Sequence, residues 1–352
     1  MRISRRVAWG VLLSAILTAA LLRQFHESTR QSPLLPVRSL LFFLLLILFL
    51  LFLRGWGQRQ EFPYAGESLR EFNLLSMVPL LIALIGEKWF SITFYSPVLA
   101  IASRAGLPES VLAALGLLLG GLGILAVAAA LLPVFPRLRP LLRDYLSARS
   151  LLQGVAGTLA VLALLYGLLG GLLLILGGKH LYLLPWWFGS WGGIRFSGQA
   201  LIALGEEIYY RGLPQSELIF LLPALGLRNP LAARVVGIGL TSTQFALEHI
   251  SGDAPNDTSV FLYTLTVAIL LGSLLVTVRS LYLCAFTHFA LNLFVLRGGL
   301  QFTDQSGRPI LDAGLYIVLY LILMTLLIYA RFGPERREIA RRRSRVVTPA
   351  AG

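Results

Sequence analysis

The sequence predicts an all-α membrane protein, a polytopic bundle of about ten transmembrane helices. Of its 352 residues, 57% are hydrophobic and only 13% are charged. The mean hydropathy is +0.77. Apolar runs that can cross a hydrocarbon layer of about 30 Å recur along the whole chain. Soluble globular domains do not have this composition, so we expect an integral membrane protein.

Ten apolar segments account for this prediction. The third is interrupted by Pro79 and by the polar residues 86–88. It can therefore be a bent or interfacial helix, which places the number of spans between eight and ten. The first follows three arginines, as in a signal peptide, but residues 21–24 contain no small-x-small cleavage site, so we expect an uncleaved span. The segments run near 7–22, 37–53, 74–100, 110–132, 151–177, 198–222, 231–250, 258–277, 281–297 and 312–331.

Two smaller patterns concern packing and the membrane surface. Gly116 and Gly120, and also Gly167 and Gly171, are four residues apart, a spacing that favours close contact between membrane helices. The tryptophan-rich stretch 186–191 is typical of an interfacial belt. A substrate platform is the alternative for this stretch.

The basic residues are distributed as membrane topology would place them. The formal net charge is +13, but the arginines lie in short loops and in the tail between apolar runs, so we do not expect a nucleic-acid partner. With alternating spans and a cytoplasmic N-terminus, most basic residues fall on one side. This bias predicts cytoplasmic termini in a cell inner or plasma membrane. The basic tail 332–352 would anchor that topology and contact anionic headgroups.

The first polar motif lies inside an apolar segment. Glu206, Glu207 and Arg211 lie where a charge costs roughly 2.5–3.5 kcal/mol on insertion scales, so they are functional candidates. Glu207 and Arg211 are four apart and can pair on one helix face. Glu206 lies about 100° around an ideal helix from Glu207 and can point elsewhere. The carboxylate of Glu206 is thus left outside this pair and can take part in a reaction.

Two further motifs lie in later segments. Phe245 precedes His249 by four residues, and His288 precedes Asn292 by the same spacing. Counting along the segments places Glu206 about two turns into its helix and His249 and Asn292 at the ends of theirs. With alternating helix directions these positions converge on one side of the bilayer, so we expect one reactive site. The only cysteine, Cys284, has no evident partner for nucleophilic chemistry, and we expect it to be part of the core.

These three motifs, Glu-Glu-x-x-x-Arg, Phe-x-x-x-His and His-x-x-x-Asn, resemble those of the CPBP intramembrane protease family, also called the Abi family. The family includes type II CAAX prenyl endopeptidases and bacteriocin-processing or immunity proteins. The motifs are complete here and cover about residues 195–297. We therefore expect a catalytic core at 195–297, N-terminal spans of unassigned role at 1–194, a last span at 298–331 and the tail at 332–352.

The resemblance implies an intramembrane endopeptidase. In that family, Glu206 with His249 would hold and activate water. His288 and Asn292 would donate to the developing oxyanion, and Glu207 with Arg211 would form a supporting pair. Burial disfavours an ionised carboxyl group, so Glu206 can act as a base only in a polar, hydrated cleft open to one face.

The cofactor and the function each have alternatives. No cofactor is favoured, because the sequence lacks a His-Glu-x-x-His signature. A divalent metal such as zinc, bound by Glu206, His249 and His288, is the alternative. The chain could also be a catalytically silent immunity or scaffold protein, or a transporter that uses the same polar cluster, although no inverted repeat is evident.

The predicted partners are the lipid bilayer and a peptide or protein substrate. Prenyl endopeptidases act on cytosolic tails, whereas the arginine bias and the residue count place this site on the extracytoplasmic side. A prenylated substrate and an exported or membrane-anchored substrate therefore both remain open.

Overall fold

The computed structural model describes residues 96–135, 138–175, 182–183, 192–223, 225–227, 229–249, 257–295, 302–303, 316–317 and 319–327. The first two predicted segments, most of the third and the basic tail lie outside these residues, as do the tryptophans at 186–191. The described chain is helical, as predicted, apart from one short antiparallel ladder. In that ladder β1 (Tyr182–Leu183) pairs with β2 (Phe302–Thr303).

The described helices fall where the apolar segments predict them, with ends shifted by a few residues. The segments predicted at 110–132, 151–177, 231–250, 258–277 and 281–297 correspond to five helices in the same order. These are α5 (Glu109–Leu131), α7 (Ala148–Ile175), α10 (Pro230–Glu248), α11 (Asp257–Val278) and α12 (Leu281–Val295). The end of the third segment corresponds to α4 (Ser96–Arg104), and residues 319–327 of the tenth are helical.

Three described helices are long and apolar enough to cross a membrane. They are α5, α7 and the part of α11 from Val260 to Val278; a shorter apolar stretch runs from Leu281 to Leu293. These helices are consistent with an integral membrane protein. The larger number of about ten spans stays a prediction from the sequence.

The chain forms two compact units. The first contains the described residues up to Leu151 and those from 192 to 289, and the second contains the remainder. Within the second unit, the Phe302 ring lies edge-on to Tyr166 at 5.7 Å between centroids. The backbone N–H of Phe302 donates to the Tyr316 hydroxyl at 2.7 Å. These contacts join the short ladder to its neighbouring helical segments.

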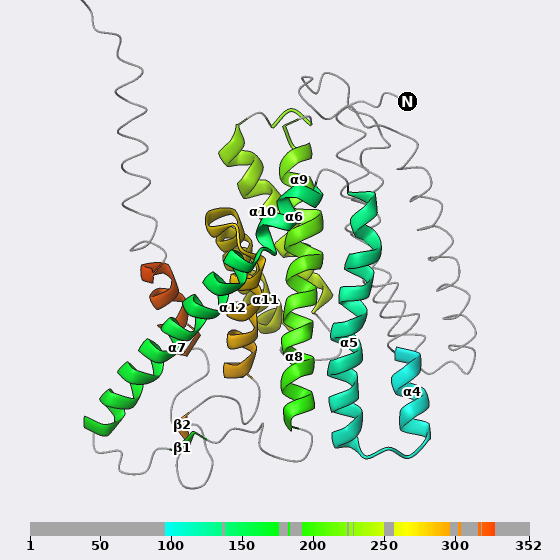
Figure 1. The fold of residues 1–352 in the computed structure, drawn as a ribbon, viewed down its shortest axis with the longest axis vertical. Coiled ribbons are helices and arrows are strands. Elements are labelled where there is room, and N and C mark those ends of the chain that lie inside the picture. Colours follow the sequence, from blue (N-terminus) through cyan, green and yellow to red (C-terminus); the bar gives the residue numbers. More distant parts are fainter. Residues whose placement is uncertain are drawn as a thin grey trace, which may run out of the picture. The chain divides into compact units, whose positions relative to one another are not determined.

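In the first unit, α5 lies along α8 (Gly192–Glu206) at backbone contact distance (Figure 1). A Cβ added at Gly198 would be 2.7 Å from the Leu118 nitrogen, and one added at Gly121 would be 2.6 Å from the Leu201 Cβ. Small residues thus allow close approach of these two helices. A Cβ added at Gly167 or Gly171 meets no described atom within 4 Å, so the close contact expected of this pair stays a prediction.

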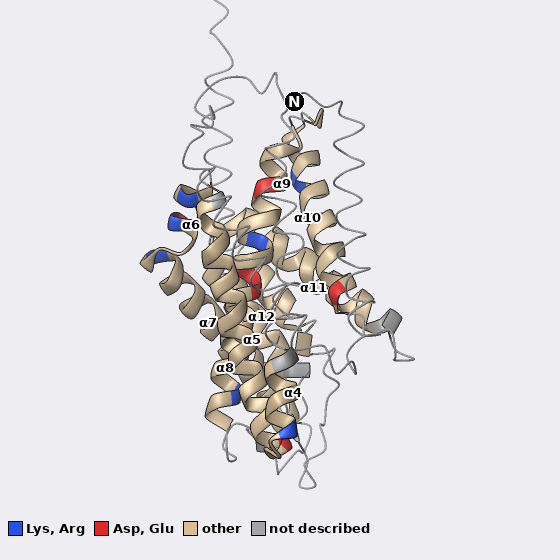
Figure 2. Cartoon of the chain, turned by 90° about the vertical axis from the view of Figure 1, so that its right-hand side faces the viewer, with Lys and Arg blue, Asp and Glu red and all other residues tan. Residues whose placement is uncertain are grey.

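A short amphipathic helix, α6 (Leu138–Tyr145), lies in the stretch that follows α5. Leu138 and Leu142 are buried, whereas Arg139 and Arg143 are exposed. Figure 2 shows blue basic residues on this helix. Its apolar side packs against the backbone at Gly212, because a Cβ added there would lie 2.9 Å from Leu142 Cδ2. The sequence did not predict this helix, since eight residues are too few for a clear apolar segment.

Candidate active site

The first motif lies on one continuous helical rod. It consists of α8, the π-helix η5 (Glu207–Gln215) and α9 (Ser216–Leu221). Pro214 lies inside η5 and has no N–H to donate, so the regular α-helical hydrogen bonding cannot continue through it. Two residues later, the Ser216 hydroxyl donates to the Arg211 carbonyl at 2.9 Å. Wide helical turns of this kind often occur at functional sites.

The rod corrects the predicted depth of Glu206. The prediction began this helix near residue 198 and placed Glu206 about two turns inside, whereas α8 begins at Gly192 and Glu206 is its last residue. A Cβ at the preceding Gly205 would contact Ile124 at 3.1 Å and lie 3.4 Å from the Gly121 carbonyl. Gly121 is one residue past the middle of α5. Glu206 therefore lies beside the middle of α5.

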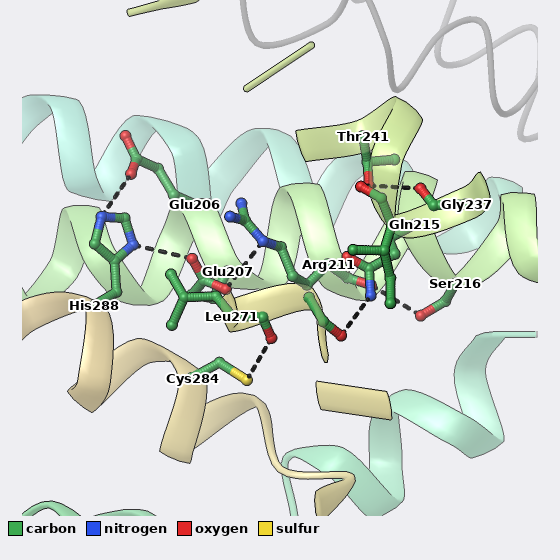
Figure 3. A network of polar contacts seen from close by, with 12 residues as sticks. Glu206, Glu207, Arg211, Gln215, Ser216, Gly237, Thr241, Leu271, Cys284 and His288 are labelled. Atoms are coloured by element: carbon green, nitrogen blue, oxygen red, sulfur yellow. Dashed lines mark hydrogen bonds and ion pairs between the residues drawn. The ribbon is translucent and has the colours of Figure 1, made fainter. Parts of the chain in front are cut away.

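His288 lies between the two carboxylates (Figure 3). Its Nδ1 is 2.9 Å from Glu207 Oε1, and its Nε2 is 3.6 Å from Glu206 Oε2. Because a carboxylate accepts, Nδ1–H donates to Glu207 and this bond fixes the ring orientation. Nε2 then faces Glu206, the more accessible of the two acids, with 14% of its side chain exposed against 0% for Glu207.

The predicted Glu207–Arg211 pair is present. Arg211 Nε is 3.4 Å from Glu207 Oε2, and both side chains are buried. The guanidinium carbon lies 4.4 Å from the centre of the Phe245 ring, where a cation–π contact stabilises it. Glu207 therefore contacts both Arg211 and His288.

His249 is held at the end of α10. Its Nδ1 lies 2.7 Å from the Phe245 carbonyl oxygen, which can only accept, so Nδ1 carries the proton. In the neutral ring, Nε2 then keeps a lone pair that can accept a proton. The ring packs on Phe245 at 4.4 Å between centroids, and Phe245 also lies 6.0 Å from the His288 ring. His249 is exposed, unlike His288.

The structure thus brings together five of the six predicted residues in the first unit. Glu206 and Glu207 contact His288, and Arg211, His249 and His288 lie around the Phe245 ring. Asn292 is on α12, one helical turn after His288, and belongs to the second unit. It is partly exposed. Its proposed part in the site continues to rest on its spacing from His288.

Sequence reasoning missed a third carboxylate beside the site. Glu248 is 7% exposed and accepts a hydrogen bond from the Tyr210 hydroxyl. It also accepts one from Gln244 Nε2 at 2.9 Å. Glu248 precedes His249, and Tyr210 falls inside the first motif, so both were available as signals. The i, i+4 spacing of Gln244 and Glu248 was the pattern that could have indicated them.

The predicted metal alternative does not fit the arrangement. Among the described residues, no group of three or more His, Cys, Asp and Glu side chains is placed to hold a metal ion. The proposed set of Glu206, His249 and His288 therefore does not form a ligand shell in the described part of the chain. Cys284 is buried, as expected, with its thiol 3.5 Å from the Leu271 carbonyl.

Comparison with known proteins identifies the segment that carries these motifs. Residues 186–294 match the family model described as type II CAAX prenyl endopeptidase Rce1-like. This segment is an Rce1-like domain. Neither the curated proteins nor the solved structures gave a match to the chain.

The Rce1-like domain contains all three motifs and ends two residues after Asn292. It belongs to the CPBP family of membrane proteases that the motifs resemble. The domain implies a protease that acts on a protein substrate. Together with the apolar helices, it indicates an intramembrane protease.

Proposed function

We propose that this chain is an endopeptidase that hydrolyses a peptide bond of a membrane-anchored, exported or prenylated protein, with water activated by Glu206 and His249. The observation that carries the proposal is the placement of His288, whose two ring nitrogens face Glu207 and Glu206 at 2.9 and 3.6 Å. Ionisable groups at this depth are costly unless they serve a function. The Rce1-like domain supports peptide hydrolysis as that function.

Water activation is assigned to the two accessible groups of the cluster. Glu206 keeps partial exposure and His249 is exposed, whereas Glu207 and Arg211 are buried. The Nε2 lone pair of His249 and a Glu206 carboxylate oxygen can each accept a proton. A positioned base of this kind contributes typically 10²–10⁴-fold to a rate. His249 or Glu206 would then return the proton to the leaving amine.

Oxyanion stabilisation is assigned to His288 and Asn292. The hydrogen bond from Nδ1–H to Glu207 leaves Nε2 directed to the Glu206 side, where a protonated Nε2 can donate to the carbonyl oxygen as it gains charge. Asn292 supplies a side-chain amide one turn further along α12. Removal of one such donor typically costs 10²–10³ in kcat.

Glu207 and Arg211 are assigned a supporting role. Glu207 pairs with Arg211, and Glu206 and Glu207 both contact His288. With both carboxylates ionised, one additional proton on His288 makes the four-residue cluster neutral. Arg211 thereby limits the cost of keeping Glu207 ionised. Glu207 in turn can hold His288 in one orientation.

Glu206→Gln tests the function directly. Protein termini are mapped by mass spectrometry in membranes from cells that carry the parent chain, a deletion or Glu206→Gln. We expect a small set of uncut termini in the deletion and in Glu206→Gln. Glu217→Gln is the matched control, because Glu217 is a buried carboxylate on α9 outside the proposed machinery, and it should retain the parent's termini.

The outcomes separate the alternatives. Identical termini in all strains would contradict proteolysis and favour a transporter. A phenotype of the deletion that Glu206→Gln does not reproduce would favour a silent scaffold, because a scaffold does not need an ionised carboxylate. Uncut termini that end in a prenylated cysteine motif would assign the substrate to the prenylated class.

A further inference from the structure

Glu248 forms a second buried polar group beside the proposed catalytic residues. It is the last residue of α10 and is 7% exposed. One carboxylate oxygen, Oε2, accepts from the Tyr210 hydroxyl, and the other, Oε1, accepts from Gln244 Nε2. Tyr210 and Glu248 occupy variable positions inside the first and second motifs, and Gln244 directly precedes the second. A buried carboxylate with two donors is costly to disrupt, so its position needs a reason.

The bond to Tyr210 joins two different elements. Tyr210 lies on η5 directly before Arg211, and Glu248 lies on α10 directly before His249. The contact therefore fixes the last turn of α10 against the π-helix.

Aromatic packing extends this connection to His249. The Tyr210 ring lies edge-on to Phe245 at 4.9 Å, and Phe245 packs on His249 at 4.4 Å. The Phe245 carbonyl also accepts from His249 Nδ1. A shift of the last turn of α10 would move this carbonyl and ring together. The orientation of His249 therefore depends on the last turn of α10, which the Glu248–Tyr210 hydrogen bond holds against η5.

We propose that Glu248 is a positioning residue, which holds the end of α10 on the π-helix through Tyr210 and thereby aims His249 at the water that it activates. The inference rests on the proposed function. Glu248 acts through hydrogen-bond geometry and exchanges no proton with substrate. Two consequences follow, one for the backbone and one for the rate.

The backbone consequence is measured without any substrate. Hydrogen–deuterium exchange of the detergent-purified chain reports opening of the last turn of α10. We expect Tyr210→Phe and Glu248→Leu each to speed exchange of the amides at 245–249 by at least about threefold. The double variant should match Glu248→Leu, because both substitutions remove the same hydrogen bond between Tyr210 and Glu248. Glu217→Gln should leave this exchange unchanged.

The rate consequence is measured with a synthetic prenylated CAAX peptide. We expect Tyr210→Phe to lower kcat by about 10- to 100-fold with KM within about twofold, because small misplacement of a catalytic group has effects of that order. Glu248→Gln should restore most of the activity lost in Glu248→Leu, since its amide oxygen still accepts from Tyr210. The shape of the pH profile should not change in any of these variants.

The exchange measurement and the rate measurement each have an outcome that overturns the inference. Unchanged exchange at 245–249 in both Tyr210→Phe and Glu248→Leu would overturn the inference. Faster exchange with unchanged kcat would overturn it too, because the turn would then not position His249. Glu248→Gln as inactive as Glu248→Leu would show proton transfer instead of positioning. A parent chain that cleaves neither this peptide nor any cellular protein would contradict the proposed function, while exchange still decides whether Glu248 holds α10.

Discussion

Glu207 and Arg211 form the least accessible charged pair of the site, with side-chain exposures of 0% and 2%. We expect Arg211→Gln to destabilise the fold by about 3–5 kcal/mol, because it leaves the Glu207 carboxylate buried without its cation. The double variant Glu207→Gln/Arg211→Gln should be more stable than Arg211→Gln alone. Equilibrium unfolding in detergent measures both differences.

The comparison also tests the role of the pair. A double variant that loses the sum of the two single effects would contradict electrostatic compensation, since independent residues add. The Gln at position 207 keeps an oxygen that can accept from His288 Nδ1. The double variant can therefore remain folded while its activity reports how much the reaction needs charge beside His288.

At the level of elements, the contact between α5 and α8 depends on Gly198. A Cβ there would lie 2.7 Å from a backbone nitrogen and 2.8 Å from a backbone carbon of α5, neither of which can turn aside. We expect Gly198→Ala to destabilise the protein by about 1–3 kcal/mol, the usual cost of overpacking, despite the better helix propensity of alanine. Thermal unfolding in detergent measures the effect.

Gly193 provides the control on the same helix. A Cβ at Gly193 meets no described atom within 4 Å, so Gly193→Ala should be neutral or slightly stabilising. Equal stability of the two alanine variants would contradict the close packing of α5 and α8. Since Gly205 continues the same contact beside Glu206, loss of packing at Gly198 should also lower activity.

Helices with long apolar runs were predictable from the sequence, and the details that build the site were not. The run at 258–277 predicted α11 within one residue at each end, because hydrophobicity sets the length of a span. The π-helix contains Pro214 and is accompanied by a hydrogen bond from the Ser216 hydroxyl to the Arg211 carbonyl, and a segment average reveals neither. The wrong start of α8 had a large effect, since it displaced Glu206 by six residues along the helix.

Among the site residues, spacing predicted the partners that lie on one helix. The pair of Glu207 and Arg211 follows from the i, i+4 rule. The hydrogen bond from His288 to Glu207 and its approach to Glu206 connect α12 with α8 and η5. Only the order of the motifs and the family resemblance indicated these contacts. Tyr210 and Glu248 were missed because each adjoins a motif residue that drew the functional assignment.

For the whole molecule, the side of the membrane on which the basic end of the first unit lies decides how substrate reaches the site. Arg104 precedes α5 and Arg143 follows it, and both are exposed. If α5 crosses the bilayer, these arginines lie on opposite faces. The exposed Arg149 and Arg279 join Arg143 at its end, because the neighbouring Ser150 and Ser280 hydroxyls are 2.7 Å apart. The bias of basic residues to the cytoplasm predicts that this end faces inward.

Cysteine labelling tests this orientation. In a Cys284→Ala background, which removes the only cysteine, we expect a membrane-impermeant maleimide to label Arg104→Cys in intact cells. Arg143→Cys should be labelled only after the cells are opened. The reverse pattern would invert the topology, and labelling of both in intact cells would contradict a transmembrane α5.

Since Gly205 packs beside Gly121, which lies roughly 15 Å along α5 from Leu131 at 1.5 Å per residue, Glu206 is within reach of a substrate tail entering from the arginine-rich end. The other end of α5, at Glu109, is about 18 Å from Gly121 by the same rise per residue, so labelling fixes the orientation of α5 and the mapping of termini decides the substrate class.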